Sequence, residues 1–182
     1  KVADIIEDYK RKNYKVIVVS SAMSGVTNEL IKKSLDISNN FSSSEHDVLV
    51  SSGEQVACSL IAGRLIHKGY KSRSWLSWQV PILTKGVHKN SRINQINKNV
   101  IIRYLKEGGI PIITGFQGVN DLNRITTLGR GGSDASAIMI AKFFKAKRCI
   151  IYTDVEGVYT TDPNKLKKAN KIKIISYEEM LE

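Results

Sequence analysis

The chain has 182 residues, of which 42% are hydrophobic, and a chain of this length can bury about 70% of its unfolded surface around one core. No apolar run reaches the roughly 18 residues of a membrane span and the start lacks a signal-peptide pattern, so we expect a cytoplasmic protein without a membrane partner. Twenty-eight Lys and Arg against seventeen Asp and Glu give a net charge of +11. The excess is scattered and not interleaved with aromatic residues, which favours a solvated basic face over a nucleic-acid site.

Alternating helices and strands are predicted from the spacing of apolar residues. Val2–Lys12 has the three- and four-residue spacing of an amphipathic helix, and Lys15–Val19 is a continuous β-branched run typical of a buried parallel strand. In chain order the further elements expected are a helix capped by Thr27 or Asn28 and ending near Ser38, an apolar stretch at Asp47–Val50, a helix over Gln55–His67, extended segments at Lys71–Trp75 and Val80–Leu83, a helix over Ile96–Lys106, a strand at Ile110–Thr114, a hairpin within Phe116–Thr127, a helix over Ser133–Lys145 and a strand at Arg148–Tyr152. This order predicts an α/β fold with a mainly parallel sheet covered on both faces, in which ligands gather at the carboxyl ends of the strands.

The segment from Thr126 to Asp134, TTLGRGGSD, predicts an anion-binding turn that leads into a helix. Its three glycines let the backbone turn tightly and approach a ligand, and Ser133 and Asp134 are good first residues for a helix. Free N–H groups at the helix start favour a negative ligand, and Arg130 adds a planar donor suited to a carboxylate or phosphate. The alternative is a hairpin loop before an ordinary capped helix.

Three further segments could carry polar ligands. SAMSGVTNEL offers several hydroxyls around Gly25, although it also suits a plain strand-to-helix connection. SSGE is interpreted as placing Glu54 at a helix start, where the dipole favours its charge, but acidic residues are common there for stability alone. In YTDVEGVYTTDP, Thr153 and Asp154 follow a predicted strand and Tyr159 offers a flat face, which suits a nucleoside; the alternative is a surface β-hairpin.

Cysteines and histidines give no sign of a metal site. Cys58 and Cys149 lie in apolar company outside any CxxC pair, so we expect buried free thiols, with a single disulfide left open. His46, His67 and His88 have no ligand-like spacing, and a metal site built on them is not expected.

In this order the segments resemble the aspartate kinases of the amino-acid kinase family. The matching blocks are VVSSAMSGVTNEL, SSGEQVACSLIAGRL, SRSWLSWQVPI, ITGFQGV, ITTLGRGGSDASA and CIIYTDVEGVYTTDP, followed by ISYEEMLE. The resemblance implies the amino-acid kinase fold, a three-layer α/β/α sandwich with a mainly parallel central sheet. It also implies transfer of the γ-phosphoryl group of ATP, with Mg²⁺, to the side-chain carboxylate of L-aspartate. The product, 4-phospho-L-aspartate, begins the synthesis of lysine, threonine, methionine and diaminopimelate.

The resemblance also implies roles for individual residues. Thr27 and Glu54 match positions around bound aspartate, with Glu54 facing the α-ammonium. Arg130 matches the arginine that grips the α-carboxylate, and Ser133 and Asp134 lie in the same substrate loop; Arg130 and Asp134 are the residues expected to act in catalysis. The nucleotide segment matches Thr153, Asp154, Tyr159, Thr160, Thr161, Asp162, Pro163 and Asn164, of which Asn164 stands where many members have an arginine.

Both ends look incomplete by the same comparison. The family's first strand carries KFGG, and a second lysine follows the YEEM-like helix; neither feature lies within residues 1–182. We therefore expect 1–182 to be part of a catalytic domain without its first strand, its C-terminal segment and its ACT regulatory domains, inactive in isolation and homo-oligomeric at full length. The alternatives are another amino-acid kinase, such as a glutamate or acetylglutamate kinase, or a catalytically silent regulatory or nucleic-acid-binding protein.

Overall fold

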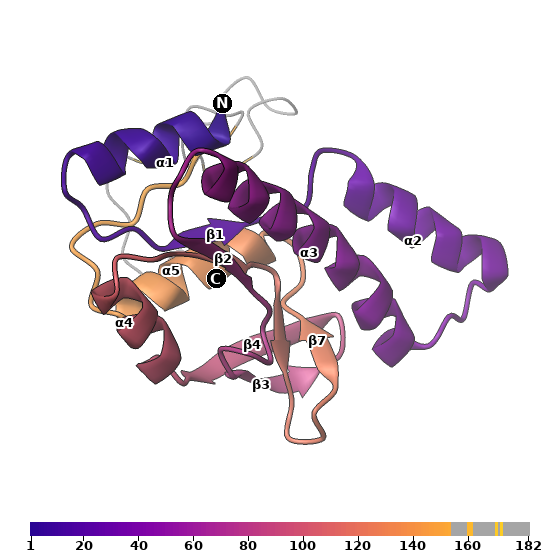
Figure 1. The fold of residues 1–182 in the computed structure, drawn as a ribbon. Coiled ribbons are helices and arrows are strands. Elements are labelled where there is room, and N and C mark those ends of the chain that lie inside the picture. Colours follow the sequence, from indigo (N-terminus) through magenta and orange to yellow (C-terminus); the bar gives the residue numbers. More distant parts are fainter. Residues whose placement is uncertain (154–159, 162–169, 171, 173–182) are drawn as a thin grey trace.

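Helices pack on two β-sheets in the computed structural model, which describes residues 1–153, 160, 161, 170 and 172 (Figure 1). The described elements are α1 (Val2–Arg11), β1 (Val18–Ser20), α2 (Val26–Ile37), α3 (Ser43–His67), β2 (Ser72–Trp75), β3 (Ile82–Val87), β4 (Asn90–Ile96), α4 (Asn99–Lys106), β5 (Ile110–Thr114), β6 (Gln117–Val119), β7 (Ile125–Thr127) and α5 (Gly132–Phe143). None of these helices is long and apolar enough to cross a membrane.

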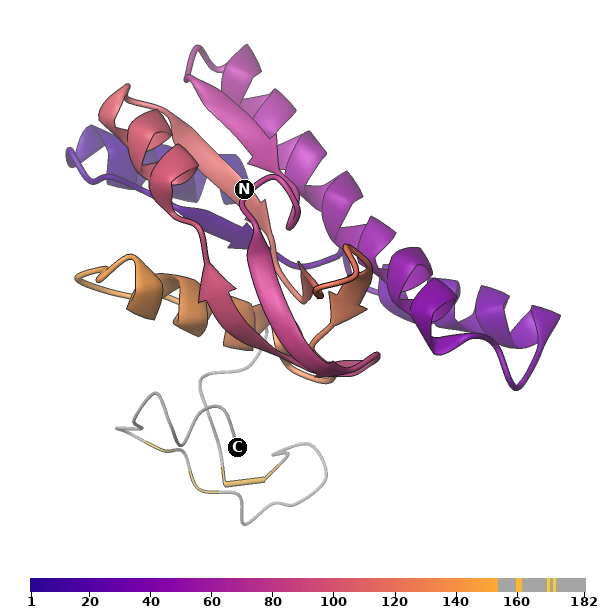
Figure 2. The same cartoon turned by 90° about the horizontal axis from the view of Figure 1, so that it is seen from below.

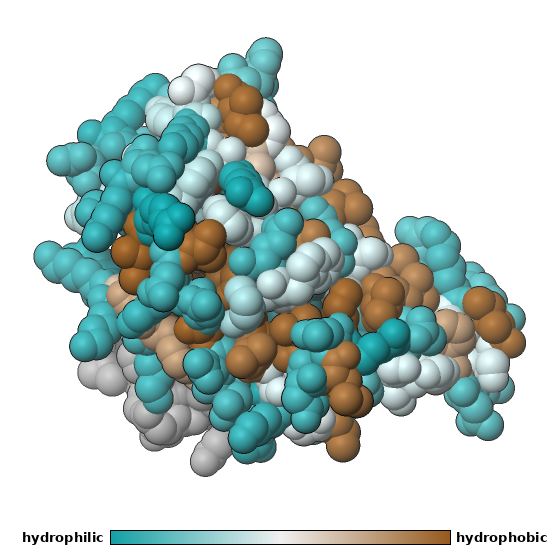
Figure 3. Space-filling view, turned by 60° about the horizontal axis from the view of Figure 1, so that its bottom comes forward, coloured by the Kyte–Doolittle hydropathy of each residue, from teal (hydrophilic) through white to brown (hydrophobic). Residues whose placement is uncertain are grey.

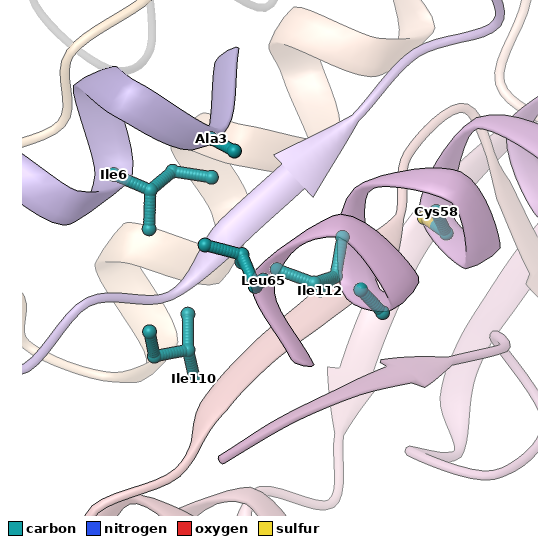
Figure 4. Close-up of a cluster of buried hydrophobic side chains, with 7 residues drawn as sticks. Ala3, Ile6, Cys58, Leu65, Ile110 and Ile112 are labelled. Atoms are coloured by element: carbon teal, nitrogen blue, oxygen red, sulfur yellow. The ribbon is translucent and has the colours of Figure 1, made fainter. Parts of the chain in front are cut away.

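The first sheet is parallel, and its central strand is buried on both faces. Its order is β1-β5-β2, and all five residues of the central strand β5 are buried. Ile110 and Ile112 pack with Ala3 of α1 and Leu65 of α3 (Figure 4), whereas Ile113 points into a second cluster with residues of α4 and α5. The predicted α/β fold, with a parallel sheet between two helical layers, is confirmed.

The second sheet is mixed and was only partly predicted. Its order is β4-β3-β6-β7, with β3 parallel to β6 and antiparallel to β4 (Figure 2). The hairpin predicted before the glycine turn is confirmed as β6 and β7. Strand β4 was missed, because Asn90–Ile96 is mostly polar and four of its seven residues are exposed, so no apolar alternation marks it.

Helix α3 is continuous, which corrects two expectations. Asp47–Val50 and the SSGE segment both lie within it, so Glu54 lies mid-helix and not at a helix start. The buried residues of α3 recur at helical spacing, but several are polar, and this hides the period in the sequence. These residues are Asp47, Val50, Ser51, Gly53, Glu54, Ala57, Cys58, Ala62 and Leu65.

The last predicted strand is absent from the described residues, where 148–152 have no regular structure. Ile150 and Tyr152 are 48% and 62% exposed, so the apolar run that suggested a buried strand remains partly in solvent. An apolar run becomes a strand only where a neighbouring strand accepts its backbone hydrogen bonds. The two cysteines are free, as expected, with Cys58 buried and Cys149 partly buried.

Glycines, not side-chain caps, begin the two helices nearest the predicted site. Gly25 precedes α2 with φ 82°, and Gly131 precedes α5 with φ 69°, both in the left-handed region that glycine adopts without strain. The expected caps Thr27 and Asn28 lie inside α2. On the face drawn in Figure 3, hydrophilic residues surround separate groups of hydrophobic residues.

Candidate active site

The carboxyl ends of β1 and β5 meet at one edge of the parallel sheet. Ser20 is in register with Thr114, and the Gly115 N–H donates to the Ser20 carbonyl at 3.0 Å. The SSAMSG loop leaves β1 at this edge. Gly115, which leaves β5, packs against Ser133: a Cβ at Gly115 would lie 3.2 Å from the Ser133 Oγ. The two loops singled out in the sequence therefore meet where α/β folds bind ligands.

Glu54 faces this edge from the middle of α3. It is 2% exposed; its Oε1 accepts a hydrogen bond from the Ala22 N–H at 3.1 Å, and its Oε2 is buried with no hydrogen-bond partner among the described residues. Gly53 lets the SSAMSG loop approach, since a Cβ there would lie 2.9 Å from the Ala22 Cβ. Burial raises the pKa of Glu54 to about 7. A buried carboxylate with one unpartnered oxygen can accept a hydrogen bond from a cationic group of a ligand.

Thr27 is brought to the same neighbourhood as Glu54. It lies in the first turn of α2 and is partly buried. The preceding residue, Val26, packs directly on α3, where a Cβ at Gly53 would lie 3.2 Å from the Val26 Cγ1. The packing of α2 on α3 therefore places the first turn of α2 beside Gly53, the residue that precedes Glu54.

The glycine turn carries Arg130, whose positive charge is opposite to that of the Glu54 carboxylate. Gly129 and Gly131 have positive φ, and α5 begins at Gly132, so the first N–H groups of α5 have no partners within the helix. Arg130 is exposed, whereas Ser133 and Asp134 are partly buried in the first turn of α5. Burial raises the pKa of Asp134. The predicted glycine turn that leads into a helix is therefore confirmed, and its anion-binding role stays a prediction.

Asp47 is a residue that the sequence reasoning missed. It is fully buried on α3 and accepts hydrogen bonds from His88, Lys89 and Thr127. His46 also lies near it, with 3.8 Å between the His46 Nδ1 and the Asp47 Oδ1, which is too long for a hydrogen bond. A signal was present in the sequence: an aspartate two helical turns before Glu54, on the same face of α3.

No group of three or more His, Cys, Asp or Glu residues in the described part of the chain could hold a metal ion.

A cavity of about 410 Å³ lies on the second sheet, and none of the predicted site residues lines it. Its lining consists of Leu83, Thr84, Lys85, Gly86, Asn94, Asn120 and Asp121.

The family of the chain follows from comparison with known proteins. The model of the amino acid kinase family matches residues 1–182. The chain belongs to the amino acid kinase family. Within this family, the chain is 50% identical to the aspartokinase of Rickettsia felis over 100% of its own length and 46% of that protein. It is 51% identical to the aspartokinase of Geobacillus stearothermophilus, over 98% of the chain and 44% of that protein. The chain thus spans less than half the length of these curated relatives.

Solved structures of amino acid kinases agree with the fold. E. coli aspartokinase III in complex with aspartate and ADP superposes with a TM-score of 0.75 at 25% identity, covering 93% of the chain and 48% of that structure. Aspartate kinase from Synechocystis superposes with a TM-score of 0.73 at 36% identity, covering 93% of the chain and 28% of that structure.

The nucleotide segment expected in an amino acid kinase lies mostly beyond the residues that the structure describes. Asp154, Tyr159, Asp162, Pro163 and Asn164 are outside them, and their assignment stays a prediction. Thr153, Thr160 and Thr161 are described and exposed. The Thr160 N–H donates to the Asn170 carbonyl at 3.0 Å, and the Thr160 Oγ1 accepts from the Asn170 N–H at 3.1 Å.

Proposed function

We propose that the protein is an aspartate kinase, which transfers the γ-phosphoryl group of ATP to the side-chain carboxylate of L-aspartate and forms 4-phospho-L-aspartate. The observation that carries the proposal is the unpartnered oxygen of buried Glu54, at the sheet edge that also bears the glycine turn with Arg130. An α-amino acid carries an ammonium and a carboxylate, so its two charged groups complement these side chains. The names of the relatives at 50% and 51% identity support the same substrate.

The proposed residues act by alignment and charge neutralisation. The side chain of aspartate is already ionised at neutral pH, so it needs no general base to attack the γ-phosphorus. Glu54 and Thr27 hold the ammonium end, Arg130 binds the α-carboxylate, and Ser133 and Asp134 shape the loop beside the reacting groups. Alignment of two reactants can lower a barrier by roughly 7–11 kcal/mol in favourable systems.

The nucleotide would be ATP, held by the segment from Thr153 to Asn164. Mg²⁺ usually binds one or two carboxylates together with substrate phosphates. We propose that Mg²⁺ arrives bound to the phosphates of ATP. We further propose that residues 1–182 form part of the catalytic domain of a cytoplasmic homo-oligomer that starts the biosynthesis of lysine, threonine, methionine and diaminopimelate.

A substrate comparison tests this proposal. ADP release by the intact protein is measured with L-aspartate, L-glutamate, N-acetylglutamate and UMP as acceptors. We expect aspartate to give the highest kcat/KM. Among the three amino-acid acceptors, N-acetylglutamate should give the lowest kcat/KM, because acetylation removes the ammonium group that Glu54 is proposed to bind. Turnover that favours another acceptor, or no aspartate-dependent turnover, contradicts the proposal.

Replacing Arg130 by alanine tests the carboxylate contact. We expect the aspartate KM to rise and kcat/KM to fall roughly 10- to 150-fold, because a hydrogen bond to a charged group contributes about 1.5–3 kcal/mol. Steady-state kinetics at saturating ATP measure this change. Arg124→Ala is the matched control, since Arg124 is an exposed arginine paired with Glu45 on the surface. Equal values of the aspartate KM and kcat/KM in the two variants would show that Arg130 does not bind aspartate.

A further inference from the structure

Asp47 joins three segments of the chain through one buried side chain. Its Oδ1 accepts a hydrogen bond from the Thr127 Oγ1 at 2.7 Å, and its Oδ2 accepts from the Thr127 N–H at 3.1 Å. The Lys89 N–H lies 3.1 Å from both carboxylate oxygens, and the His88 Nδ1 lies 2.7 Å from Oδ2. The carboxylate of α3 thus holds the tip of the β3–β4 hairpin and the end of β7.

Both of these segments support the glycine turn. Thr127 ends β7 and is followed immediately by Leu128 and the turn. On its other side the turn rests on the hairpin, because a Cβ at Gly129 would lie 3.2 Å from the Lys89 carbonyl oxygen and 3.3 Å from the Asn90 Oδ1. Asp47 therefore fixes the start of the turn and the surface on which the turn lies.

The same helix carries Glu54. Asp47 and Glu54 are seven residues apart, which is about two turns of an α-helix, and both side chains are buried on the same side of α3. A helix is stiff over two turns, so a group fixed to Asp47 is also fixed relative to Glu54. The amide of Gln117 adds to this arrangement by donating to the Ser51 carbonyl at 3.0 Å, one turn from Asp47.

We propose that Asp47 is a positioning residue that sets the separation between Glu54 and the turn carrying Arg130. The proposal rests on the proposed function, in which those two residues bind opposite ends of one amino acid. Asp47 itself is buried behind the turn and does not touch the substrate. Its role is to determine how long an amino acid fits between the two charged groups, and hence to favour aspartate over glutamate.

Asp47→Asn in the intact protein tests this role. The amide keeps the size of the side chain but replaces one acceptor oxygen with an NH₂ group, which faces the N–H donors of Lys89 or Thr127. We expect kcat/KM for aspartate to fall roughly 10- to 100-fold, mainly through KM, because a small displacement of a binding group has effects of this size. The preference for aspartate over glutamate should narrow, and the KM for ATP should stay unchanged.

Two other variants make the result interpretable. Glu45 lies two residues before Asp47 on α3 and forms an exposed ion pair with Arg124. Glu45→Gln removes this pair and should leave all kinetic constants unchanged. Thr127→Val removes only the hydroxyl that donates to Asp47 and should raise the aspartate KM less than Asp47→Asn does. Since Thr127 and Asp47 share a contact, the double variant should lose less than the product of the single losses.

The outcomes separate this inference from the proposed function. Failure of the wild-type protein to turn over aspartate contradicts the proposed function. With an active wild-type enzyme, the inference is overturned if Asp47→Asn keeps the wild-type aspartate KM and selectivity. It is also overturned if the KM values for aspartate and ATP change equally together with a lower Tm, because that pattern marks a purely structural role. If Asp47→Asn does not fold, an unchanged aspartate KM in Thr127→Val overturns it.

Discussion

Glu54→Gln is expected to abolish most of the proposed aspartate kinase activity of the intact protein and to stabilise the free protein at alkaline pH. Loss of one partner from a buried ion pair costs about 3–5 kcal/mol, so kcat/KM for aspartate should fall by a factor on the order of 10² to 10⁴. The amide has nearly the shape of the carboxylate and can still accept from the Ala22 N–H. The loss should therefore report the missing charge and not a collapsed site.

The stability effect follows from the pKa of Glu54, which burial raises from 4.5 to about 7. A carboxyl group with a higher pKa in the folded state stabilises the fold fully below about pH 4.5, and this contribution is lost as pH rises through about 7. At pH 8 the wild-type protein must bury a charge, at a cost of up to about 3 kcal/mol, and glutamine avoids this cost. The gain should disappear near pH 4.5.

Urea unfolding at pH 4.5 and pH 8, together with steady-state kinetics, measures both effects. Glu45→Gln is the matched control: an exposed glutamate of the same helix, whose replacement should change neither activity nor the pH dependence of stability. Wild-type aspartate kinetics in Glu54→Gln would show that the ammonium binds elsewhere. A loss of stability at pH 8 would show that the charge of Glu54 has a partner in the free protein.

Gly118→Ala is expected to lower the free energy of unfolding by about 1–3 kcal/mol or more. Gly118 lies on β6 beside β3, and a Cβ there would lie 2.7 Å from the backbone oxygen of Ile82 and would overlap the Thr84 methyl group. Backbone cannot give way as a flexible side chain can, so β3 and β6 must separate. Displacement of Thr84 would also disturb its hydroxyl contact of 2.6 Å with Thr126, beside the residue held by Asp47.

Gly63→Ala is the control for Gly118→Ala. Gly63 is an exposed residue of α3, and a Cβ there would meet nothing within 4 Å. Alanine favours the helix by about 1 kcal/mol over glycine, so this variant should be more stable than the wild-type protein. Thermal and urea unfolding of both variants measure the difference. Equal stability of Gly118→Ala and the wild type would contradict the close approach of β3 and β6.

Elements with a clear local apolar pattern were predictable from the sequence, and elements that depend on distant partners were not. The amphipathic α1 and the apolar β5 were predicted close to their observed bounds, because α1 has one helical period and β5 is a continuous apolar run. Strand β1, predicted at Lys15–Val19, is observed at Val18–Ser20, so its predicted start was three residues early and its predicted end one residue early. Strand β4 escaped because its pairing with β3, and not its own composition, determines its structure.

The candidate site shows the same division. Glycines at positive φ and the helix after them could be predicted because local backbone geometry demands those residues. The position of Glu54 on its helix was wrong, because the buried polar residues of α3 concealed the periodicity of the helix. The spacing of Asp47 and Glu54 indicated a shared helix face, but the sequence could not show the partners of Asp47, since Lys89 and Thr127 are 42 and 80 residues away in the chain.

The complete burial of β5 has a consequence for how the protein moves. Backbone amides in the most protected strand of a domain exchange with solvent only when much of the domain opens. We therefore expect β5, which forms the floor of the proposed site, to stay rigid while the site binds its ligands. Any rearrangement that accompanies ligand entry must then occur in the segments that surround this floor. Hydrogen-exchange rates that differ between the floor and its surroundings would map those segments directly.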